Sequence, residues 1–235
     1  MRIVLIGCGG IGGAVAPVLC RFLYAERRRT HILFVDGDTY ERKNEARMAL
    51  AWTRANKAIA LAGELAEAFG RVLTIESVPE FVTPDRLPDI VQNGDVVFLA
   101  VDNHRTRKQV ADHVAELDDV TLISGGNDGV EHGEDGCFGS VQIVRRADGR
   151  NLTSRLDAFH PEIAEPADRS PGEVVVGCED LAESSAPQLL FTNVFVSAVM
   201  LNAFYGWLRG TLRYEEVYLD AGQNRVQPVE RQGEA

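Results

Sequence analysis

The 235-residue sequence lacks the features that mark several other classes of protein. Its four cysteines, Cys8, Cys20, Cys137 and Cys178, form no C-x-x-C pair, so neither a disulfide scaffold nor a paired-cysteine zinc site is supported. Basic residues are also few, with 24 lysines and arginines against 35 acidic residues and a net charge of -11. Because an acidic chain repels a phosphate backbone, we expect no nucleic-acid partner.

An uninterrupted apolar run of membrane length is missing as well. The most apolar segment, residues 189–208, is interrupted by Thr192, Asn193, Ser197, Asn202 and Gly206. This pattern favours a buried core helix over a membrane span. The N-terminus enters an apolar strand directly, without the layout of a signal peptide. We therefore expect a cytoplasmic protein with reduced thiols and no membrane partner.

Short β-branched segments alternate with helical segments through the first half of the chain. The strands that we expect here are residues 1–6, 31–35, 72–78, 95–101 and 120–123. The helices that we expect between them include residues 47–69 and 103–116. Strict alternation of this kind predicts a Rossmann-like α/β fold, with a mostly parallel sheet and helices on both faces.

The pattern changes after residue 124. Late strands are expected at residues 137–145, 212–219 and 225–229, and a helix at 188–208. We therefore predict one domain in three parts. Residues 1–146 form its nucleotide-binding half, 147–187 a crossover or mobile loop, and 188–235 a helix and antiparallel strands that complete it.

A glycine-rich loop follows the first expected strand. Gly7-Cys8-Gly9-Gly10-Ile11-Gly12 fits G-x-G-x-x-G between a strand and a helix. In such a loop Gly7 permits a tight turn, Gly9 lets the backbone approach a phosphate, and Gly12 lets the helix lie close to the strand. The free N–H groups at the helix start then face the anion. The loop predicts a nucleotide site formed by Gly7, Gly9, Gly10 and Gly12.

Asp36 ends the second expected strand, where a carboxylate can accept hydrogen bonds from both hydroxyls of a ribose. The loop and this aspartate alone fit a nicotinamide oxidoreductase as well as an ATP-dependent enzyme. An oxidoreductase would also need a proton donor near the nicotinamide, and the sequence holds no Tyr-x-x-x-Lys pair. The residues after Asp36 separate the two interpretations.

The segment Asp36-x-Asp38-Thr39-Tyr40-Glu41-x-x-Asn44-x-x-Arg47 resembles D-x-D-x-V-E-x-S-N-L-x-R-Q, a motif of the ThiF/MoeB/HesA family of ubiquitin-activating-enzyme-like proteins. Lys57 lies ten residues beyond Arg47, roughly where the family places its phosphate lysine. Asp102-Asn103-x-x-Thr106-Arg107 is similar to the family's D-N-x-x-x-R segment, whose aspartate holds magnesium.

The likeness extends to later segments. Ser124-Gly125-Gly126 and Gly139-Ser140-Val141 are similar to two small-residue strands of the family, and Cys178 to Pro187 resembles its C-x-x-x-G-V-x-x-P helix start. Two departures stand out. The Ser and Gln of S-N-L-x-R-Q are Lys43 and Met48 here, and the paired C-x-x-C motifs of many relatives are absent, so we expect no zinc.

The resemblance implies an adenylyltransferase that binds ATP and Mg²⁺ and activates a carboxylate. Asp102 would hold the metal, Arg47 and Lys57 would bind phosphates, and Asn44 would bind a phosphate or the incoming carboxylate. The other nucleotide contacts that we expect are Gly7, Gly9, Gly10, Gly12, Asp36 and Asp38. The implied acceptor is the C-terminus of a small ubiquitin-like or sulfur-carrier-like protein or of a peptide, and the implied assembly is a homodimer.

This set of residues also suits adenylation on chemical grounds. A carboxylate attacks the α-phosphorus while pyrophosphate leaves, so negative charge grows on the leaving phosphates and cations must surround them. Arg47 and Lys57 supply fixed charge, and an aspartate such as Asp102 is a hard oxygen ligand suited to Mg²⁺. A strong base is not required, because a carboxylate is already ionised near neutral pH.

Cys178 raises a separate question, because in some relatives a cysteine takes the activated acyl group as a thioester. Its position before an expected helix favours a thiolate, whereas the neighbouring Glu179 and Asp180 oppose one. Cys178 is therefore a tentative thiol acceptor, with an incidental thiol as the alternative. Two alternatives to the enzyme also stay open: a non-catalytic nucleotide-binding partner subunit, and the oxidoreductase.

Overall fold

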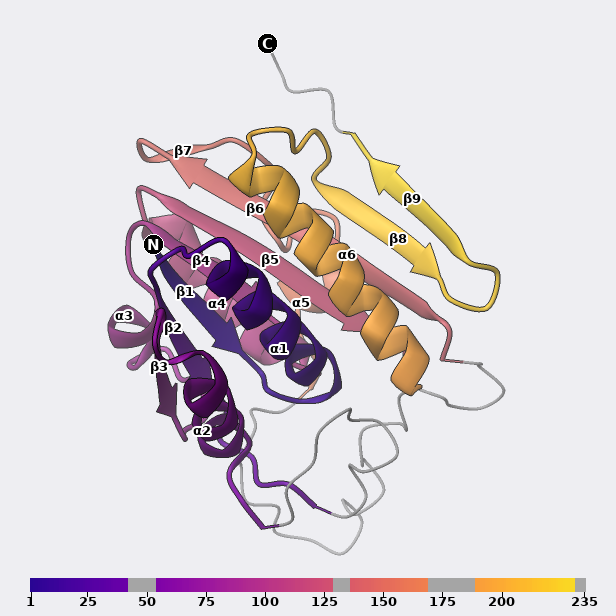
Figure 1. Cartoon of the computed structure of the whole chain (residues 1–235). Helices are drawn as coiled ribbons and strands as arrows, with labels where there is room; N and C mark the ends of the chain where they lie inside the picture. The colour runs from indigo at the N-terminus through magenta and orange to yellow at the C-terminus, as the bar shows by residue number, and fades with distance from the viewer. Residues whose placement is uncertain (42–53, 129–135, 169–188, 231–235) are drawn as a thin grey trace, which may run out of the picture.

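A computed structural model describes residues 1–41, 54–128, 136–168 and 189–230. Within these residues the chain builds a nine-stranded sheet (Figure 1). Its strands are β1 (Arg2–Ile6), β2 (Thr30–Val35), β3 (Leu73–Val78), β4 (Asp95–Leu99), β5 (Val120–Asn127), β6 (Phe138–Ala147), β7 (Arg150–Asn151), β8 (Glu216–Asp220) and β9 (Arg225–Val229). The helices are α1 (Gly10–Ala25), α2 (Lys57–Phe69), α3 (Leu87–Ile90), α4 (His104–Glu116), α5 (Pro161–Ala164) and α6 (Leu190–Leu208).

The strand order is β3-β2-β1-β4-β5-β6-β8-β9, with β7 paired to β6. The first five strands run parallel, and β6, β8 and β9 join in antiparallel fashion. The order turns back between β1 and β4, and in open α/β sheets the crevice beyond the carboxyl ends of the strands at such a point is the usual ligand site. The sequence prediction of a mostly parallel sheet with late antiparallel strands is confirmed.

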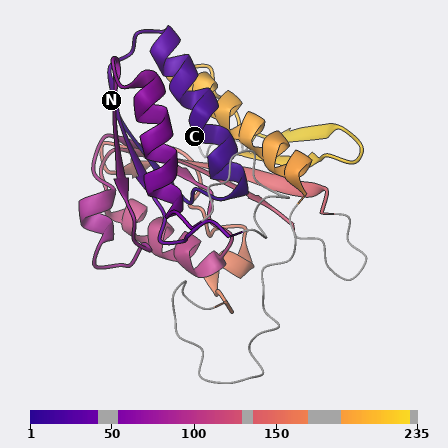
Figure 2. The same cartoon turned by 60° about the horizontal axis from the view of Figure 1, so that its bottom comes forward.

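Helices cover both faces of the sheet. Helices α1, α2 and α6 lie on one face over a core that includes Leu5, Phe34 and Phe98 (Figures 1 and 2). Helices α3, α4 and α5 lie on the opposite face over a second core that includes Val97 and Leu122. Since both faces are buried, the central parallel strands β1, β2 and β4 read as nearly continuous apolar runs, which is why the sequence identified them readily.

Helix α6 is long and apolar enough to span a membrane by length and composition alone. In the fold it packs against α1 and across β5 and β6. Thr192 and Ser197 are buried and hydrogen-bonded, whereas Asn202 is exposed: Thr192 donates a hydrogen bond to the carbonyl of Gly136, and Ser197 donates to that of Ile11. Satisfied buried polar groups of this kind fit the core helix that the sequence predicts.

Several boundaries differ from the sequence prediction. The late strand expected from residue 212 begins only at Glu216. A helix over 47–69 is wrong in its described part, because α2 begins only at Lys57. Asn56 caps α2 by accepting the N–H of Ile59, and its amide donates to the carbonyls of Asp36 and Asp38. Strand β5 continues to Asn127, and the region expected to be a loop after residue 147 contains β7 and α5.

Candidate functional site

The glycine loop forms a tight turn between β1 and α1. Gly7 has φ +90°, and a Cβ there would lie 2.6 Å from the carbonyl oxygen of Ala100, so only glycine fits without strain. A Cβ on Gly12 would collide with the carbonyl of Gly7. A Cβ on Gly9 would meet nothing within 4 Å, so no packing contact requires glycine at this position. The missing side chain leaves open space beside the loop.

The start of α1 supplies hydrogen-bond donors to that space. Gly9 is the N-cap residue, Gly10 is the first helical residue, and no side chain caps the helix. Backbone N–H groups at an uncapped helix start lack intrahelical partners and attract anions. The geometry therefore suits a phosphate at this loop.

Asp36, at the end of β2, is already engaged by the backbone around it. One carboxylate oxygen accepts the N–H of Cys8 at 2.6 Å and the other accepts the N–H of Asp38 at 2.8 Å. Burial raises the pKa of Asp36, although the charge of Lys57 lowers it. Each oxygen keeps a second lone pair, so Asp36 can hold the glycine loop and still accept a ribose hydroxyl.

Lys57 is the first residue of α2 and is only 6% exposed. Its ammonium group lies 2.8 Å from a carboxylate oxygen of Asp38, and its backbone N–H donates to the carbonyl of Asp38. The structure thus places Lys57 beside the cavity, with its ammonium buried and paired with an exposed carboxylate. A buried ammonium with one described carboxylate partner retains donors for a second anion.

Asp102 follows β4 at the other side of the same cavity. Its side chain is exposed and makes no hydrogen bond or ion pair with the described residues. Asn103, and not Asp102, caps α4 by accepting the N–H of Thr106 at 2.8 Å. Asp102 is therefore not used as the helix cap, and its carboxylate is available to bind a cation.

Arg107 does not pair directly with Asp102. It is buried and donates to the hydroxyl of Ser124 at 2.5 Å and to the carbonyls of Val101 and Gly125. Burial lowers the pKa of Arg107 to about 10, and the charge of Asp102 raises it. Because these acceptors follow β4 and lie in β5, Arg107 holds the carboxyl ends of these two strands together next to the cavity.

Asp168 closes the start of α4. Its carboxylate accepts the backbone N–H groups of His104 at 2.5 Å and Arg105 at 3.0 Å, and its carbonyl accepts the guanidinium of Arg105. The first backbone N–H groups of α4 therefore already have a partner within the protein. The sequence offered no indication of this contact, since 64 positions separate Asp168 from His104.

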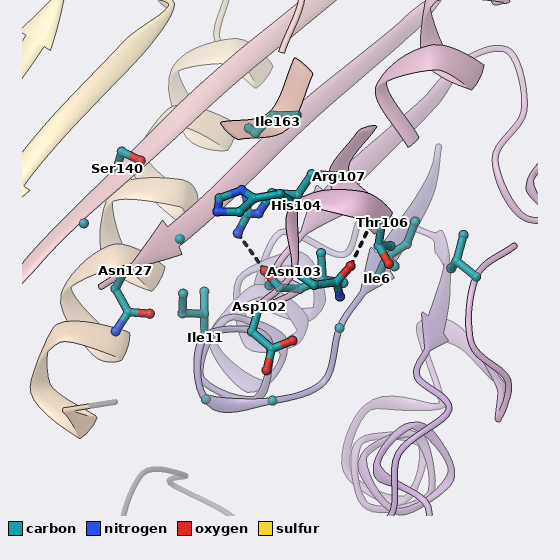
Figure 3. Close-up of a pocket in the computed structure, with 18 of the residues that line it drawn as sticks. Ile6, Ile11, Asp102, Asn103, His104, Thr106, Arg107, Asn127, Ser140 and Ile163 are labelled. Atoms are coloured by element: carbon teal, nitrogen blue, oxygen red, sulfur yellow. Dashed lines mark hydrogen bonds between the residues drawn. The ribbon is translucent and has the colours of Figure 1, made fainter. Parts of the chain in front are cut away.

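These groups surround one cavity of about 650 Å³ at the carboxyl ends of β1, β2 and β4. Gly7, Gly9, Gly10, Asp36, Asp38, Lys57 and Asp102 all line it, whereas Gly12 does not. Figure 3 shows Asp102 pointing toward the loop that leads into α1, with Asn127 and Ile11 beside the same space and Ser140 and Ile163 farther along it. The structure thus brings together residues that are close to 100 positions apart.

Three predicted site residues, Asn44, Arg47 and Cys178, lie outside the described residues. Their positions relative to the cavity stay predictions. Of the other three cysteines, Cys8 and Cys20 are buried, and burial raises the pKa of both thiols, to about 12 for Cys20. A raised pKa disfavours the thiolate, so neither is suited to act as a nucleophile.

The far wall of the cavity carries a polar cluster that the sequence analysis missed. His160 lies between two carboxylates, 2.6 Å from Glu216 and 2.9 Å from Glu162. Gln142 donates to the hydroxyl of Ser140 at 2.9 Å. These hydrogen bonds raise the pKa of His160, so its doubly protonated form is favoured. A contact across 56 positions, as between His160 and Glu216, leaves no local sequence pattern.

Solved structures share this fold. The crystal structure of E. coli MccB with ATP aligns with a TM-score of 0.71 at 14% identity, covering 100% of this chain and 65% of that one. The structure of MccB with MccA-N7isoAsn gives 0.70 at 14%, covering 100% and 66%. PaaA gives 0.64 at 19%, covering 97% and 63%. The chain therefore spans a little under two thirds of the length of these structures.

The search of curated protein sequences finds no match. The family comparison is decisive, because the profile described as "ThiF family" matches residues 1–193. That range contains the glycine loop, Asp36, Lys57, Asp102 and the strands that position them. The chain belongs to the ThiF family.

Proposed function

We propose that this chain is an adenylyltransferase, which transfers AMP from ATP to a carboxylate. The observation that carries the proposal is the meeting of an uncapped helix start, the buried ammonium of Lys57 and the free carboxylate of Asp102 at one cavity. Membership of the ThiF family supports the proposal, as does the binding of ATP by MccB, which has the same fold.

In the proposed complex the triphosphate lies against the glycine loop, where Gly9 leaves room for it. Asp36 accepts a ribose hydroxyl with its remaining lone pairs. Lys57 donates to the phosphates, assisted by Arg47 and Asn44 from the family motif. Fixed cationic donors of this kind stabilise the charge that grows on the leaving pyrophosphate.

Asp102 fits the proposed magnesium site. Its carboxylate is exposed to the cavity and unpaired among the described residues. No group of three potential metal ligands occurs in the described part of the chain. Magnesium bound to nucleotides commonly uses one or two carboxylates, with phosphates and water as its other ligands, so a single aspartate is sufficient. When bound, the ion would neutralise phosphate charge.

The proposed reaction is a displacement at the α-phosphorus. An oxygen of the acceptor carboxylate forms a bond to the α-phosphorus, and the bond between that phosphorus and the oxygen leading to the β-phosphate breaks. The products are an acyl adenylate and pyrophosphate. The protein residues orient the two reactants and stabilise the charge of the leaving group, and no side chain needs to remove a proton.

The proposed acceptor is the C-terminus of a peptide or of a small ubiquitin-like or sulfur-carrier-like protein. The structures of MccB with N-formylated MccA and with MccA-N7isoAsn support a peptide acceptor, since MccB shares the fold. A cytoplasmic location and a homodimer complete the proposal. Exposed apolar side chains on α6, notably Phe191, Val194 and Tyr205, support a second copy covering this helix.

The test compares the wild-type protein with Asp102→Asn. Calorimetry measures ATP binding with and without Mg²⁺, and acceptor-dependent release of pyrophosphate measures adenylation. We expect Mg²⁺ to strengthen ATP binding to the wild type but not to the variant, and the rate of pyrophosphate release to fall about 100-fold or more. Asp85→Asn is the matched control, because Asp85 is exposed and lies outside the cavity.

Each contrary result has a distinct meaning. An Asp102→Asn variant that releases pyrophosphate at the wild-type rate would exclude the proposed role of Asp102. A wild type that binds ATP and never releases pyrophosphate would instead be a non-catalytic partner subunit. Binding of NAD(H) without binding of ATP would select the oxidoreductase.

A further inference from the structure

Asp102 stands on a short loop between β4 and α4, and no side chain in the described part of the chain holds its carboxylate. The loop is short because β4 ends at Leu99 and α4 begins at His104. In the proposed function this carboxylate is the protein's ligand to Mg²⁺. A metal ligand depends on neighbouring groups that orient it, and their loss typically weakens metal binding about 10- to 100-fold. The position of Asp102 must therefore be set by whatever fixes the backbone of this loop.

The backbone just after Asp102 is fixed by a residue from a distant segment. The carboxylate of Asp168 accepts the N–H groups of His104 at 2.5 Å and Arg105 at 3.0 Å, and the guanidinium of Arg105 donates to the carbonyl of Asp168 at 2.7 Å. We call these three hydrogen bonds the Asp168 clasp. A helix start is usually completed by a side chain at its own N-cap or by water. Here the side chain of the N-cap residue, Asn103, accepts the N–H of Thr106, so the first two donors of α4 depend on the clasp.

The clasp also ties down a second part of the cavity wall. Phe159, His160, Glu162 and Ile163 line the cavity, and Asp168 ends the same described segment of the chain. Helix α5, which lies within this segment, packs against α4. The clasp thus joins the loop of Asp102 to the wall formed by residues 159–163.

The charges around the clasp favour a cation. Burial lowers the pKa of Arg107, and carboxylates from three separate segments, those of Asp102, Glu162 and Asp168, act in the opposite direction. With Arg105 and Arg107 as the cations of this group, the three carboxylates are in excess. The clasp moreover occupies backbone donors that would otherwise attract a phosphate to α4. Asp168 thus contributes both geometry and charge to a cation site at Asp102.

We propose that Asp168 is a positioning residue of the magnesium site, which holds the loop of Asp102 through the clasp and keeps phosphates away from the start of α4. The inference rests on the proposed adenylation, and it names a residue on which the metal site of that reaction depends. It predicts that Asp168 matters for ATP that carries Mg²⁺ and not for ATP alone. Without the clasp Asp102 would be free to turn away from the ion, and the two freed N–H groups would offer a competing anion site.

The experiment measures ATP binding by calorimetry for the wild type, Asp168→Asn and Asp168→Ala, each with Mg²⁺ and with a chelator in its place. For Asp168→Ala we expect the affinity with Mg²⁺ to fall about tenfold or more. Without Mg²⁺ its affinity should be unchanged or higher, because one negative charge is removed and two donors are freed. Asp168→Asn removes the charge and can still accept one of the two N–H groups, so its loss should be smaller. A substitution that merely destabilises the fold would weaken binding equally in both conditions.

The matched control is Glu165→Gln, which should bind ATP as the wild type does, because Glu165 is exposed and lies outside the cavity. A second measurement needs no nucleotide. Hydrogen exchange by NMR compares the amides of His104 and Arg105 in the nucleotide-free wild type and in Asp168→Ala. We expect exchange to be about tenfold or more faster in the variant, with the amide of Val110, farther along α4, unchanged.

Should Asp168→Ala fail to fold, Asp168→Asn and the exchange rates of the wild type decide the matter. Amides of His104 and Arg105 that exchange in the wild type as fast as those of an unstructured chain would show that the clasp does not form. Equal losses with and without Mg²⁺, or a wild-type response to Mg²⁺ in both variants, overturn the inference, and the adenylation stands if Asp102→Asn still abolishes that response. Equal losses in Asp168→Asn and Asp168→Ala assign the effect to charge alone and overturn the positioning role. A wild type that binds no ATP in either condition counts against the adenylation itself, and against this inference with it.

Discussion

Lys57 provides the sharpest test of how the cavity holds a nucleotide. In the described residues its buried ammonium forms one direct ion pair, with the carboxylate of Asp38, which is 54% exposed, and its charge also lowers the pKa of the buried Asp36. Lys57→Met removes the charge and keeps the length of the apolar stem. Asp38 can be solvated once its partner is gone, and Asp36 keeps the backbone N–H donors of Cys8 and Asp38, so the free energy of unfolding should change by only about 1 kcal/mol.

The effect on the reaction should be much larger. Two unit charges about 4 Å apart interact by about 4 kcal/mol at an effective dielectric constant near 20. Each 1.36 kcal/mol corresponds to a tenfold change in rate, so the full loss would approach about 1,000-fold. Part of this energy already stabilises bound ATP, and its loss raises KM; the rest is gained only in the transition state, and its loss lowers kcat. Both parts enter kcat/KM. We therefore expect a fall of about 100- to 1,000-fold in kcat/KM for ATP.

Acceptor-dependent pyrophosphate release and urea unfolding are measured on the same preparations. Lys108→Met is the matched control, since Lys108 pairs with Asp112 on α4 outside the cavity. It should leave the rate unchanged. A Lys57→Met protein that unfolds at the wild-type urea concentration and keeps kcat/KM within about twofold would refute the role of this charge. A large loss of stability would show instead that the ion pair with Asp38 is mainly structural.

Two further predictions concern the glycine loop and the pH dependence of stability. Gly12→Ala should destabilise the protein by about 1–3 kcal/mol or more in urea unfolding, because its Cβ meets the carbonyl of Gly7, whereas Gly9→Ala should fold normally and weaken ATP binding by calorimetry. The raised pKa of His160 contributes stability that is fully present below its usual value of 6.5 and is lost as pH rises through the folded value. Urea unfolding from pH 6 upward should show this decline, and His160→Gln should flatten it; an equal decline in the variant would assign it to another group.

The parallel half of the sheet could be predicted from the sequence, because the apolar residues that identify each strand are adjacent in the chain. Runs such as residues 95–99 are apolar throughout, as expected for strands buried on both faces. The glycine loop was equally readable, since the positive φ of Gly7 and the close contact of Gly12 with the carbonyl of Gly7 arise within the turn itself. Asp36 and Asp102 could be placed because each follows a buried strand, and carboxyl ends of neighbouring parallel strands share one edge of the sheet.

The remaining features depend on contacts between distant segments. Strand β5 extends to Asn127 because β6 pairs with it there, and small residues such as Gly125 carry little strand propensity of their own. Helix α2 begins at Lys57 because Asn56 is held by the carbonyls that follow β2, a restraint that helical periodicity does not reveal. The His160 cluster joins three separate parts of the chain, so none of them carries its pattern.

Helices α1 and α4, which both begin at the cavity, explain how one site can sort opposite charges. At α4 the donors are already used, because Asn103 accepts one N–H and the carboxylate of Asp168 accepts two more. A second anion there would meet both a shortage of donors and the charge of Asp102 and Asp168. At α1 no side chain caps the helix, and Gly9 leaves the approach open. The physics therefore favours phosphates at α1 and a cation at Asp102, which is the polarity that a displacement with departing pyrophosphate requires.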